Sequence, residues 1–234
     1  MEYKNQQPDP THFPRYCGIS TYARLKLLED DEKCDIAIVG IPYDSGVTFR
    51  PGARFGPESI RINSRLIRPY NINQHKSPFK NNIIKDAGDI SCNPFNIHSS
   101  INTISNELDK LHSRVKNLII LGGDHTISYP CLRSMSRKFG QVALLHFDSH
   151  FDTWDEYFGE KCTHGTPFKR ALEEDLIDVD HSIHVGIHGT INDYTDIEND
   201  KKLGFKTIFT TEFESLGLFG IIDKILSRVE DIPV

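Results

Sequence analysis

Three residues that can bind a metal ion occur at alternate positions in one short segment: Asp148, His150 and Asp152, within His146-Phe-Asp-Ser-His-Phe-Asp-Thr. A further imidazole, that of His125, follows another apolar run, in Leu118-Ile-Ile-Leu-Gly-Gly-Asp-His. Two carboxylates and two imidazoles can together hold divalent cations, which turn water into a nucleophile at neutral pH. The sequence therefore predicts a metal-dependent hydrolytic site. Ligands of oxygen and nitrogen without thiolate favour Mn²⁺, with Ni²⁺, Co²⁺ or Zn²⁺ as alternatives.

This prediction requires two strands that end close together. The runs 118–121 and 142–147 are continuously apolar, which is typical of parallel strands covered on both faces. Ligands of such sheets bind beyond the carboxyl ends of the strands. If the two strands are neighbours, the four side chains converge, and positions i, i+2 and i+4 share a face provided that the chain is extended. We interpret Asp124 as a carboxylate that fixes the loop, and His146 is open to a structural role.

Strands and helices alternate along the rest of the chain. Further strands are expected at 35–41, 82–88, 183–187 and 207–209, and helices at 57–67, 97–115, 167–174 and 217–229. The helix at 97–115 follows from an apolar stripe of 4-3-4-3-4 spacing. Repeated strand–helix alternation predicts an α/β fold with right-handed crossovers and a mostly parallel sheet.

The composition is that of an ordinary soluble protein. The 234 residues suit one large domain, and a net charge of −6 without a long basic run argues against nucleic acid or an anionic membrane as a partner. Five scattered cysteines, never in Cys-x-x-Cys spacing, suggest reduced thiols and a cytoplasmic location. We detect no targeting signal and no apolar stretch approaching 18 residues.

Five segments closely resemble the ureohydrolases, the arginase and agmatinase family. They are Gly122-Gly-Asp-His-Thr-Ile-Ser128, His146-Phe-Asp-Ser-His-Phe-Asp-Thr-Trp-Asp155, Thr163-His-Gly-Thr-Pro-Phe168, Ile41-Pro-Tyr-Asp-Ser-Gly46 and Arg50-Pro-Gly-Ala-Arg-Phe-Gly-Pro-Glu-Ser59. The resemblance runs from about residue 12 to the end of the chain. The N-terminal loop and Trp154 resemble the agmatinase branch more than arginase itself.

The resemblance implies a three-layer α/β/α sandwich around a mostly parallel sheet, two Mn²⁺ ions per site, and a trimer or hexamer. Residues 1–33 would form an N-terminal arm and 34–234 the ureohydrolase domain. It also implies that His125, Asp148 and Asp152 bind one metal, and that Asp148 bridges to a second metal held by His150.

The resemblance further implies catalytic and substrate-binding residues. His164 matches the family position proposed to carry a proton to the leaving amine, with a plain loop role as the alternative. Tyr43 and Asp44 are expected to line the site mouth. Trp154 would either wall the substrate channel or pack within its loop, and packing is favoured.

One expected motif is absent from the sequence. The family's second ligand cluster, a later Asp-x-Asp-x-x-Asp-Pro, does not occur before Val234, and Asp178-Val-Asp180 is expected at the opposite, amino end of its strand. We therefore expect a ureohydrolase domain that lacks its C-terminal strands.

The expected activity is that of an agmatinase, which converts agmatine and water to putrescine and urea. Guanidinobutyrate and guanidinopropionate are alternative substrates. A non-catalytic, truncated subunit is the alternative function, and little activity is expected of these 234 residues alone.

Overall fold

A computed structural model describes residues 6–234, which divide into two compact units, one ending at Ile127 and one spanning Ser128–Val234. Each unit contains one three-stranded sheet whose strand pairs are all parallel, with helices packed beside it. The predicted α/β class with parallel strands is thus confirmed. The predicted boundary between an arm and a domain at residue 33 stays a prediction.

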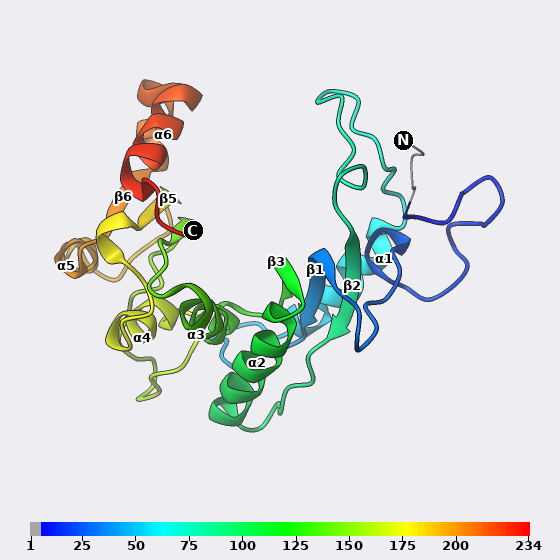
Figure 1. The fold of residues 1–234 in the computed structure, drawn as a ribbon. Coiled ribbons are helices and arrows are strands. Elements are labelled where there is room, and N and C mark those ends of the chain that lie inside the picture. The colour runs from blue at the N-terminus through cyan, green and yellow to red at the C-terminus, as the bar shows by residue number, and fades with distance from the viewer. Residues whose placement is uncertain (1–5) are drawn as a thin grey trace. The chain divides into compact units, whose positions relative to one another are not determined.

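The first unit is built on the strand order β2-β1-β3 (Figure 1). Its elements are β1 (Cys34–Ile41), α1 (Gly56–Ser64), β2 (Ile84–Asp89), α2 (Ile97–His112) and β3 (Val115–Gly122). β1 is central and almost wholly buried, as expected of an apolar run covered on both faces. The register pairs Ile41 with Gly122, so the loops that follow β1 and β3 leave the sheet at the same level.

Helix α2 confirms the apolar stripe read from its sequence. Ile101, Ile104 and Leu108 are buried together with Ser105, whereas Asn106 is exposed. The helix begins after Asn96, whose side-chain oxygen accepts a hydrogen bond from the backbone N–H of Ser99 at 2.9 Å. Packing of the stripe and this cap together explain where the helix lies and where it begins.

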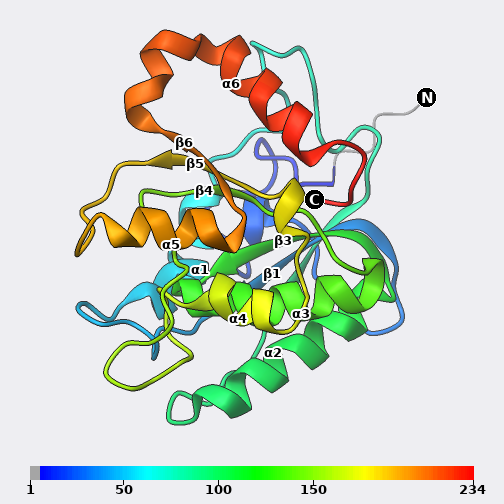
Figure 2. The ribbon, with the colours of Figure 1, turned by 90° about the vertical axis from the view of Figure 1, so that its left-hand side faces the viewer.

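The second unit is built on the strand order β4-β5-β6. Its elements are α3 (Ser128–Phe139), β4 (Leu145–Phe147), α4 (Pro167–Glu173), β5 (Ile183–Ile187), α5 (Thr195–Leu203), β6 (Lys206–Phe209) and α6 (Phe213–Val229). Ile183, Val185 and Ile208 form a core with α6 on one face of this sheet. Figure 2 shows α5 on the side of these strands away from α6.

Several predicted elements of the second unit differ from the structure. The strand expected at 142–147 is shorter, because the backbone N–H groups of Ala143 and Leu144 donate to Pro233 O and to the Ser182 hydroxyl instead of to a ladder. Helices α3 and α5 were not predicted. The last helix begins earlier than expected and is interrupted at Gly217, whose φ is 62°.

Residues 6–33 contain one short 3-10 helix, Tyr22–Arg24, and otherwise follow an irregular path with a single bridge between Leu27 and Asp86. The arm predicted for 1–33 stays a prediction, and residues 1–5 lie outside the described part. Among the described residues, no helix is long and apolar enough to cross a bilayer.

Candidate metal centre

The loop after β3 depends on Gly123. Its φ is +84°, and a Cβ atom there would lie 2.5 Å from the carbonyl oxygen of Ile41, so a side chain cannot be accommodated. The next residue, Asp124, donates its backbone N–H to Tyr43 O at 2.7 Å. The tight Gly-Gly turn therefore brings the chain alongside the loop after β1, and it leads directly into His125.

Asp124 fixes this loop, as predicted. Its Oδ2 accepts a hydrogen bond from the backbone N–H of Gly46 at 2.9 Å, and its Oδ1 accepts one from that of Thr126 at 2.8 Å. Both carboxylate oxygens are therefore engaged by backbone donors, one in the loop after β1 and one directly after His125. This arrangement orients the short 3-10 helix His125–Ile127, on which the candidate ligand lies.

Asp44 has a comparable role in the loop between β1 and α1. Its buried carboxylate accepts hydrogen bonds from the backbone N–H of Gly52 at 2.6 Å and from the side chain of Arg54 at 2.5 Å. Burial alone would raise the pKa of Asp44, but these hydrogen bonds together hold it below its ordinary value. Tyr43 is also buried. The substrate-binding roles expected for both residues stay predictions.

The chain leaves the extended conformation immediately after β4. Asp148 still donates its backbone N–H to Val185 O, but residues 148–150 then bend, and Asp152 has a φ of +54°. The premise that Asp148, His150 and Asp152 share one face of an extended strand was therefore wrong. Asp is one of the few residues that adopt left-handed conformations, because its short side chain can hydrogen-bond locally.

The carboxylate of Asp148 lies at the centre of this bend. Its Oδ1 accepts a hydrogen bond from the backbone N–H of His150 at 2.9 Å, while its Oδ2 lies 3.5 Å from Nε2 of His146. His146 and Asp152 are buried, and Asp148 is half-buried. A buried carboxylate and imidazole next to a partly open carboxylate can hold a cation and leave one side accessible.

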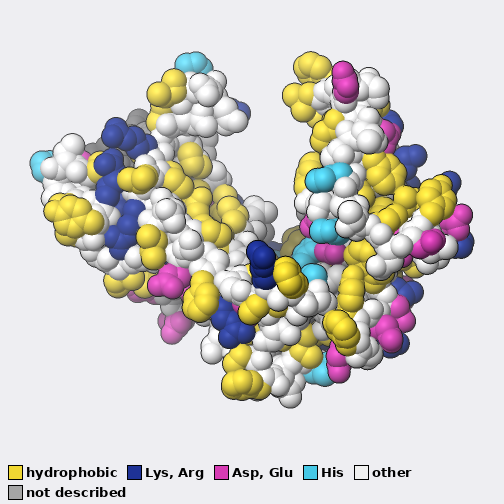
Figure 3. Space-filling model, turned by 180° about the vertical axis from the view of Figure 1, so that it is seen from behind, with side chains coloured by type: hydrophobic (Ala, Val, Ile, Leu, Met, Phe, Trp, Pro, Cys, Tyr) yellow, Lys and Arg dark blue, Asp and Glu magenta, His cyan; other side chains and the backbone are white. Residues whose placement is uncertain are grey.

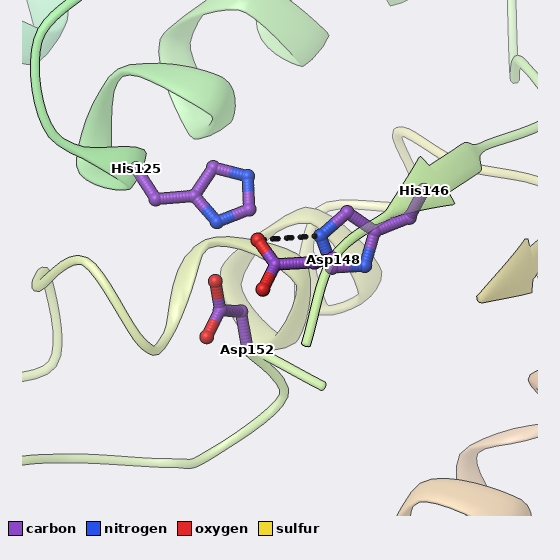
Figure 4. Close-up of side chains that lie close together, drawn as sticks. All are labelled: His125, His146, Asp148 and Asp152. Carbon is purple, nitrogen blue, oxygen red and sulfur yellow. Dashed lines mark ion pairs between the residues drawn. The ribbon is translucent and has the colours of Figure 1, made fainter. Parts of the chain in front are cut away.

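Four side chains each offer a ligand atom within 4.8 Å of one another: His125, His146, Asp148 and Asp152. Figure 4 shows these side chains pointing toward a common centre, with the His146–Asp148 ion pair drawn. Three of the four belong to the second unit, and His125 lies three residues before α3. The assignment of these residues as ligands is developed below as a proposal.

His150 lies beside this group but outside it. Its Nδ1 is 3.5 Å from Asp148 Oδ1, and its side chain is exposed. Its ring lies close to Gly189, where a Cβ atom would come within 2.7 Å of the imidazole. Histidine side chains emerge next to acidic ones on the visible face of the second unit (Figure 3). The structure thus leaves His150 at the surface next to Asp148.

The donor set fits Mn²⁺ or a similar cation. It consists of carboxylate oxygens and imidazole nitrogens, which suit divalent cations of intermediate hardness. His146 Nε2 and Asp148 Oδ2 are too far apart for a good hydrogen bond, yet they point at the same place. This spacing suits two ligands of one ion.

His164 belongs to an aromatic stack in the same unit. Its ring stacks on that of Tyr157 with centroids 6.1 Å apart, and Trp154 packs edge-on against the same tyrosine at 6.0 Å. Burial raises the pKa of Tyr157, and the negative charge of Asp152 raises it further. The half-buried indole of Trp154 is consistent with packing in the loop, while the roles expected for His164 and Trp154 stay predictions.

Asp178 and Asp180 lie in a short turn that precedes β5, at its amino end, as expected. Asp178 accepts from the side chain of His181 at 2.9 Å, and this hydrogen bond lowers the pKa of Asp178. These carboxylates therefore do not join the group after β4.

Two functional candidates were missed by sequence inspection. His184 on β5 and Asp200 on α5 are buried and form a contact chain with His146. The alternation within β5 could have shown that His184 faces away from Ile183 and Val185, but not which strand lies beside it.

Comparison with known proteins agrees with the fold and the site. The arginase family model matches residues 34–234. A guanidinobutyrase of Pseudomonas aeruginosa is 38% identical over 94% of this chain and 70% of its own, and a mitochondrial agmatinase of Gallus gallus is 34% identical over 98% and 68%. The solved structure of proclavaminate amidino hydrolase from Streptomyces clavuligerus aligns with a TM-score of 0.89 at 34% identity, over 95% of this chain and 74% of that one.

The chain therefore belongs to the arginase family, and its α/β fold is that of the arginase-like sandwich. It spans about two thirds of the length of the curated relatives that it matches.

Proposed function

We propose that the protein is a metal-dependent hydrolase of guanidino compounds that releases urea. The observation that carries this proposal is the group of two carboxylates and two imidazoles at the ends of β3 and β4, found in a chain of the arginase family. Three relatives are named as a guanidinobutyrase, an agmatinase and a guanidinopropionase, and each name denotes hydrolysis of a guanidino compound. These names support the reaction class.

His125, Asp148 and Asp152 are proposed to hold the first Mn²⁺, and Asp148 and His150 to reach a second. A divalent cation bound there supplies the Lewis acidity that activates water for attack on the guanidinium carbon. The position of His150, next to Asp148 but outside the compact group, is consistent with separate ions.

His164 is proposed to transfer the proton that the departing amine requires. Attack of water on the guanidinium carbon forms the C–O bond of urea, and the bond from that carbon to the tail nitrogen breaks. The amine is a poor leaving group unless it is protonated, and an imidazole side chain can carry that proton as a general acid. The ring of His164 stacks on that of Tyr157.

Agmatine is the proposed substrate, with 4-guanidinobutyrate and 3-guanidinopropionate as the alternatives. These compounds share the guanidino group and differ in the tail, which is a cationic amine in agmatine and a carboxylate in the acids. Among the relatives, one is named for a substrate with an amine tail and two are named for substrates with a carboxylate tail. The substrate class is therefore supported more strongly than the individual substrate.

The test is urea release by the purified chain, loaded with Mn²⁺ after removal of metal, with each of the three compounds. The expected result is Mn²⁺-dependent urea formation that is lost in Asp148→Ala and kept in His98→Ala, an exposed control on α2. Urea release from none of the three compounds, by a chain shown to bind Mn²⁺, would refute the enzyme proposal.

That outcome would favour the second candidate, a metal-binding subunit without activity. The specific observation behind it is that His150 is exposed and lies outside the compact group of four donors, so the ligands proposed for a second ion are not gathered as closely as those of the first.

A further inference from the structure

The segment that carries Asp152 has no strand ladder to hold it. Residues 148–166, all of them described, connect β4 to α4 through an irregular path whose one bridge joins Tyr157 and Glu160. Asp152 has a φ of +54°, a conformation that residues with a Cβ atom rarely adopt and that persists only where surrounding contacts enforce it. The carboxylate of Asp152, one of the four grouped donors, therefore depends on the contacts that hold the chain around it.

The chain is held on both sides of the Asp152 side chain by other parts of the same unit. The side chain of Phe151 is 2% exposed, and the carbonyl oxygen of Asp152 accepts a hydrogen bond from the backbone N–H of Phe168 at 3.3 Å. On the other side, the hydroxyl of Thr153 donates a hydrogen bond to Oδ1 of Asp200 at 3.1 Å. Asp152 and Thr153 share one planar peptide unit, so this hydrogen bond restricts the rotation of Asp152 about ψ.

Asp200 is both charged and deeply buried. Of the nine residues of α5, it alone is buried, with an exposed fraction of 2%. Its Oδ2 accepts a hydrogen bond from the hydroxyl of Thr207 on β6 at 3.4 Å, and its Oδ1 lies 3.3 Å from Nε2 of His184 on β5. Burying an ionisable carboxylate is costly unless polar partners compensate it, so an apolar residue would dock α5 more simply. The carboxylate is therefore explained better by what it holds than by the docking of α5.

The partners of Asp200 are of two kinds. His184 and Thr207 lie in the strands β5 and β6, where the ladder already fixes the backbone. Thr153 lies in the segment without a ladder, directly after Asp152. The hydrogen bond from Thr153 is thus the contact of Asp200 that can determine where a neighbouring side chain points, and that neighbour is a grouped donor.

We propose that Asp200, through the hydroxyl of Thr153, holds Asp152 in the conformation that presents its carboxylate to the metal centre. The proposal rests on the metal centre proposed above, with Asp152 as one of its ligands. Asp200 and Thr153 are positioning residues that act through Asp152 and are not themselves ligands. A ligand that is already held in its bound conformation loses less conformational entropy when the ion binds, so the affinity for the ion is higher.

The first test is the Mn²⁺ affinity of Thr153→Val, measured by calorimetry on folded protein. The substitution removes the donating hydroxyl and keeps the shape of the side chain. Loss of a group behind a ligand commonly weakens metal binding by about 10-fold to 100-fold, and we expect a Kd increase at the lower end of this range, because the contact is one residue removed from the ligand. Thr153→Ser retains a hydroxyl and should bring the Kd back to within about twofold of that of the unaltered chain.

The matched control is Thr207→Val, which removes the other hydroxyl that donates to the same carboxylate. Each substitution leaves Asp200 with one hydroxyl donor fewer, but only Thr153 adjoins Asp152. We expect Thr207→Val to leave the Kd within about twofold, since its strand is paired and lies away from the ligand segment. A Kd that rises equally in both variants would assign the effect to the docking of α5 and would overturn the proposal.

The second test needs no metal. Hydrogen exchange of the metal-free full chain, followed by mass spectrometry, reports how readily residues 148–156 open. We expect faster exchange of this segment in Thr153→Val than in the unaltered chain or in Thr207→Val, with unchanged exchange in α2 of the first unit. Equal exchange of residues 148–156 in all three proteins would overturn the role of the Thr153 hydrogen bond in holding them.

If Thr153→Val does not fold, Thr153→Ala replaces it with the same expectations. An unchanged Kd in the folded variant would overturn the positioning role and leave the metal centre intact. Absence of Mn²⁺ binding by the unaltered chain would instead overturn the metal centre and, with it, the positioning role.

Discussion

At the scale of single residues, the carboxylate of Asp44 stabilises a loop through hydrogen bonds to both of its oxygens. It accepts from two backbone N–H groups, those of Gly52 and Arg54, and pairs with the Arg54 guanidinium at 2.5 Å. These contacts hold the Arg-Pro-Gly-Ala-Arg turn between β1 and α1. Since the pKa of Asp44 is lower in the folded protein than the ordinary value of 3.8, its ionised form stabilises the fold.

We predict that Asp44→Asn lowers the free energy of unfolding by about 1 to 3 kcal/mol at pH 7, the range for hydrogen bonds to a charged group. Because the folded pKa is depressed, this contribution is fully present above pH 3.8 and is lost as the pH falls below that value. The difference between variant and parent should therefore narrow at pH 3. Urea unfolding at pH 7, 5 and 3 measures it.

The matched control is Asp30→Asn, an exposed carboxylate of the same unit. It should change the unfolding free energy by less than about 0.5 kcal/mol at every pH. A loss in Asp44→Asn that is equal at pH 7 and pH 3 would show that the ionised carboxylate is not the stabilising species.

Sequence inspection predicts three of the four grouped donors, and it misses two buried residues near them for a physical reason. His125, Asp148 and Asp152 were found because they follow apolar runs within a few residues. The function of Asp124 in fixing the loop could also be predicted, since it directly follows the Gly122-Gly123 turn. His184 and Asp200 lie on β5 and α5, and their contact with His146 depends on strand register, which one sequence does not specify.

At the scale of elements, α2 is the helix that the sequence predicts best. Its apolar stripe has the helical period, and Leu108 at its centre is completely buried. Helix α5 escaped prediction because it is mostly charged, and helix α3 escaped it because Pro130, near its start, is a residue that favours the end of a helix elsewhere in the chain. β4 was overestimated because Val142 and Ala143 are buried without pairing in the β4–β5 ladder.

We predict that Leu108→Ala lowers the free energy of unfolding by about 2 to 5 kcal/mol, because it removes buried methyl groups and leaves a cavity. Asn106→Ala, an exposed change on the same helix, should alter it by less than about 0.5 kcal/mol. Chemical denaturation followed by circular dichroism measures both variants. A loss below about 1 kcal/mol in Leu108→Ala would mean that α2 is not anchored through this stripe.

At the scale of the whole molecule, ligand binding and folding are linked. An ion that binds only the folded chain raises the free energy of unfolding by about 2.7 kcal/mol when its concentration is 100 times the Kd. Family membership and the four grouped donors both lead us to expect such an ion. Stability in the presence and absence of Mn²⁺ therefore reports on the metal centre without requiring any substrate.

We predict that Mn²⁺ raises the melting temperature of the unaltered chain and that EDTA reverses the increase. Asp148→Ala should abolish the shift, because Asp148 is a proposed ligand of both the first and the second ion. His150→Ala should reduce it if His150 holds a second ion, while the exposed control His98→Ala should keep it. Differential scanning fluorimetry with a Mn²⁺ titration measures all four proteins. A full Mn²⁺-induced shift in Asp148→Ala would contradict the assignment of the centre, because the compact group cannot lose its central carboxylate and keep its affinity.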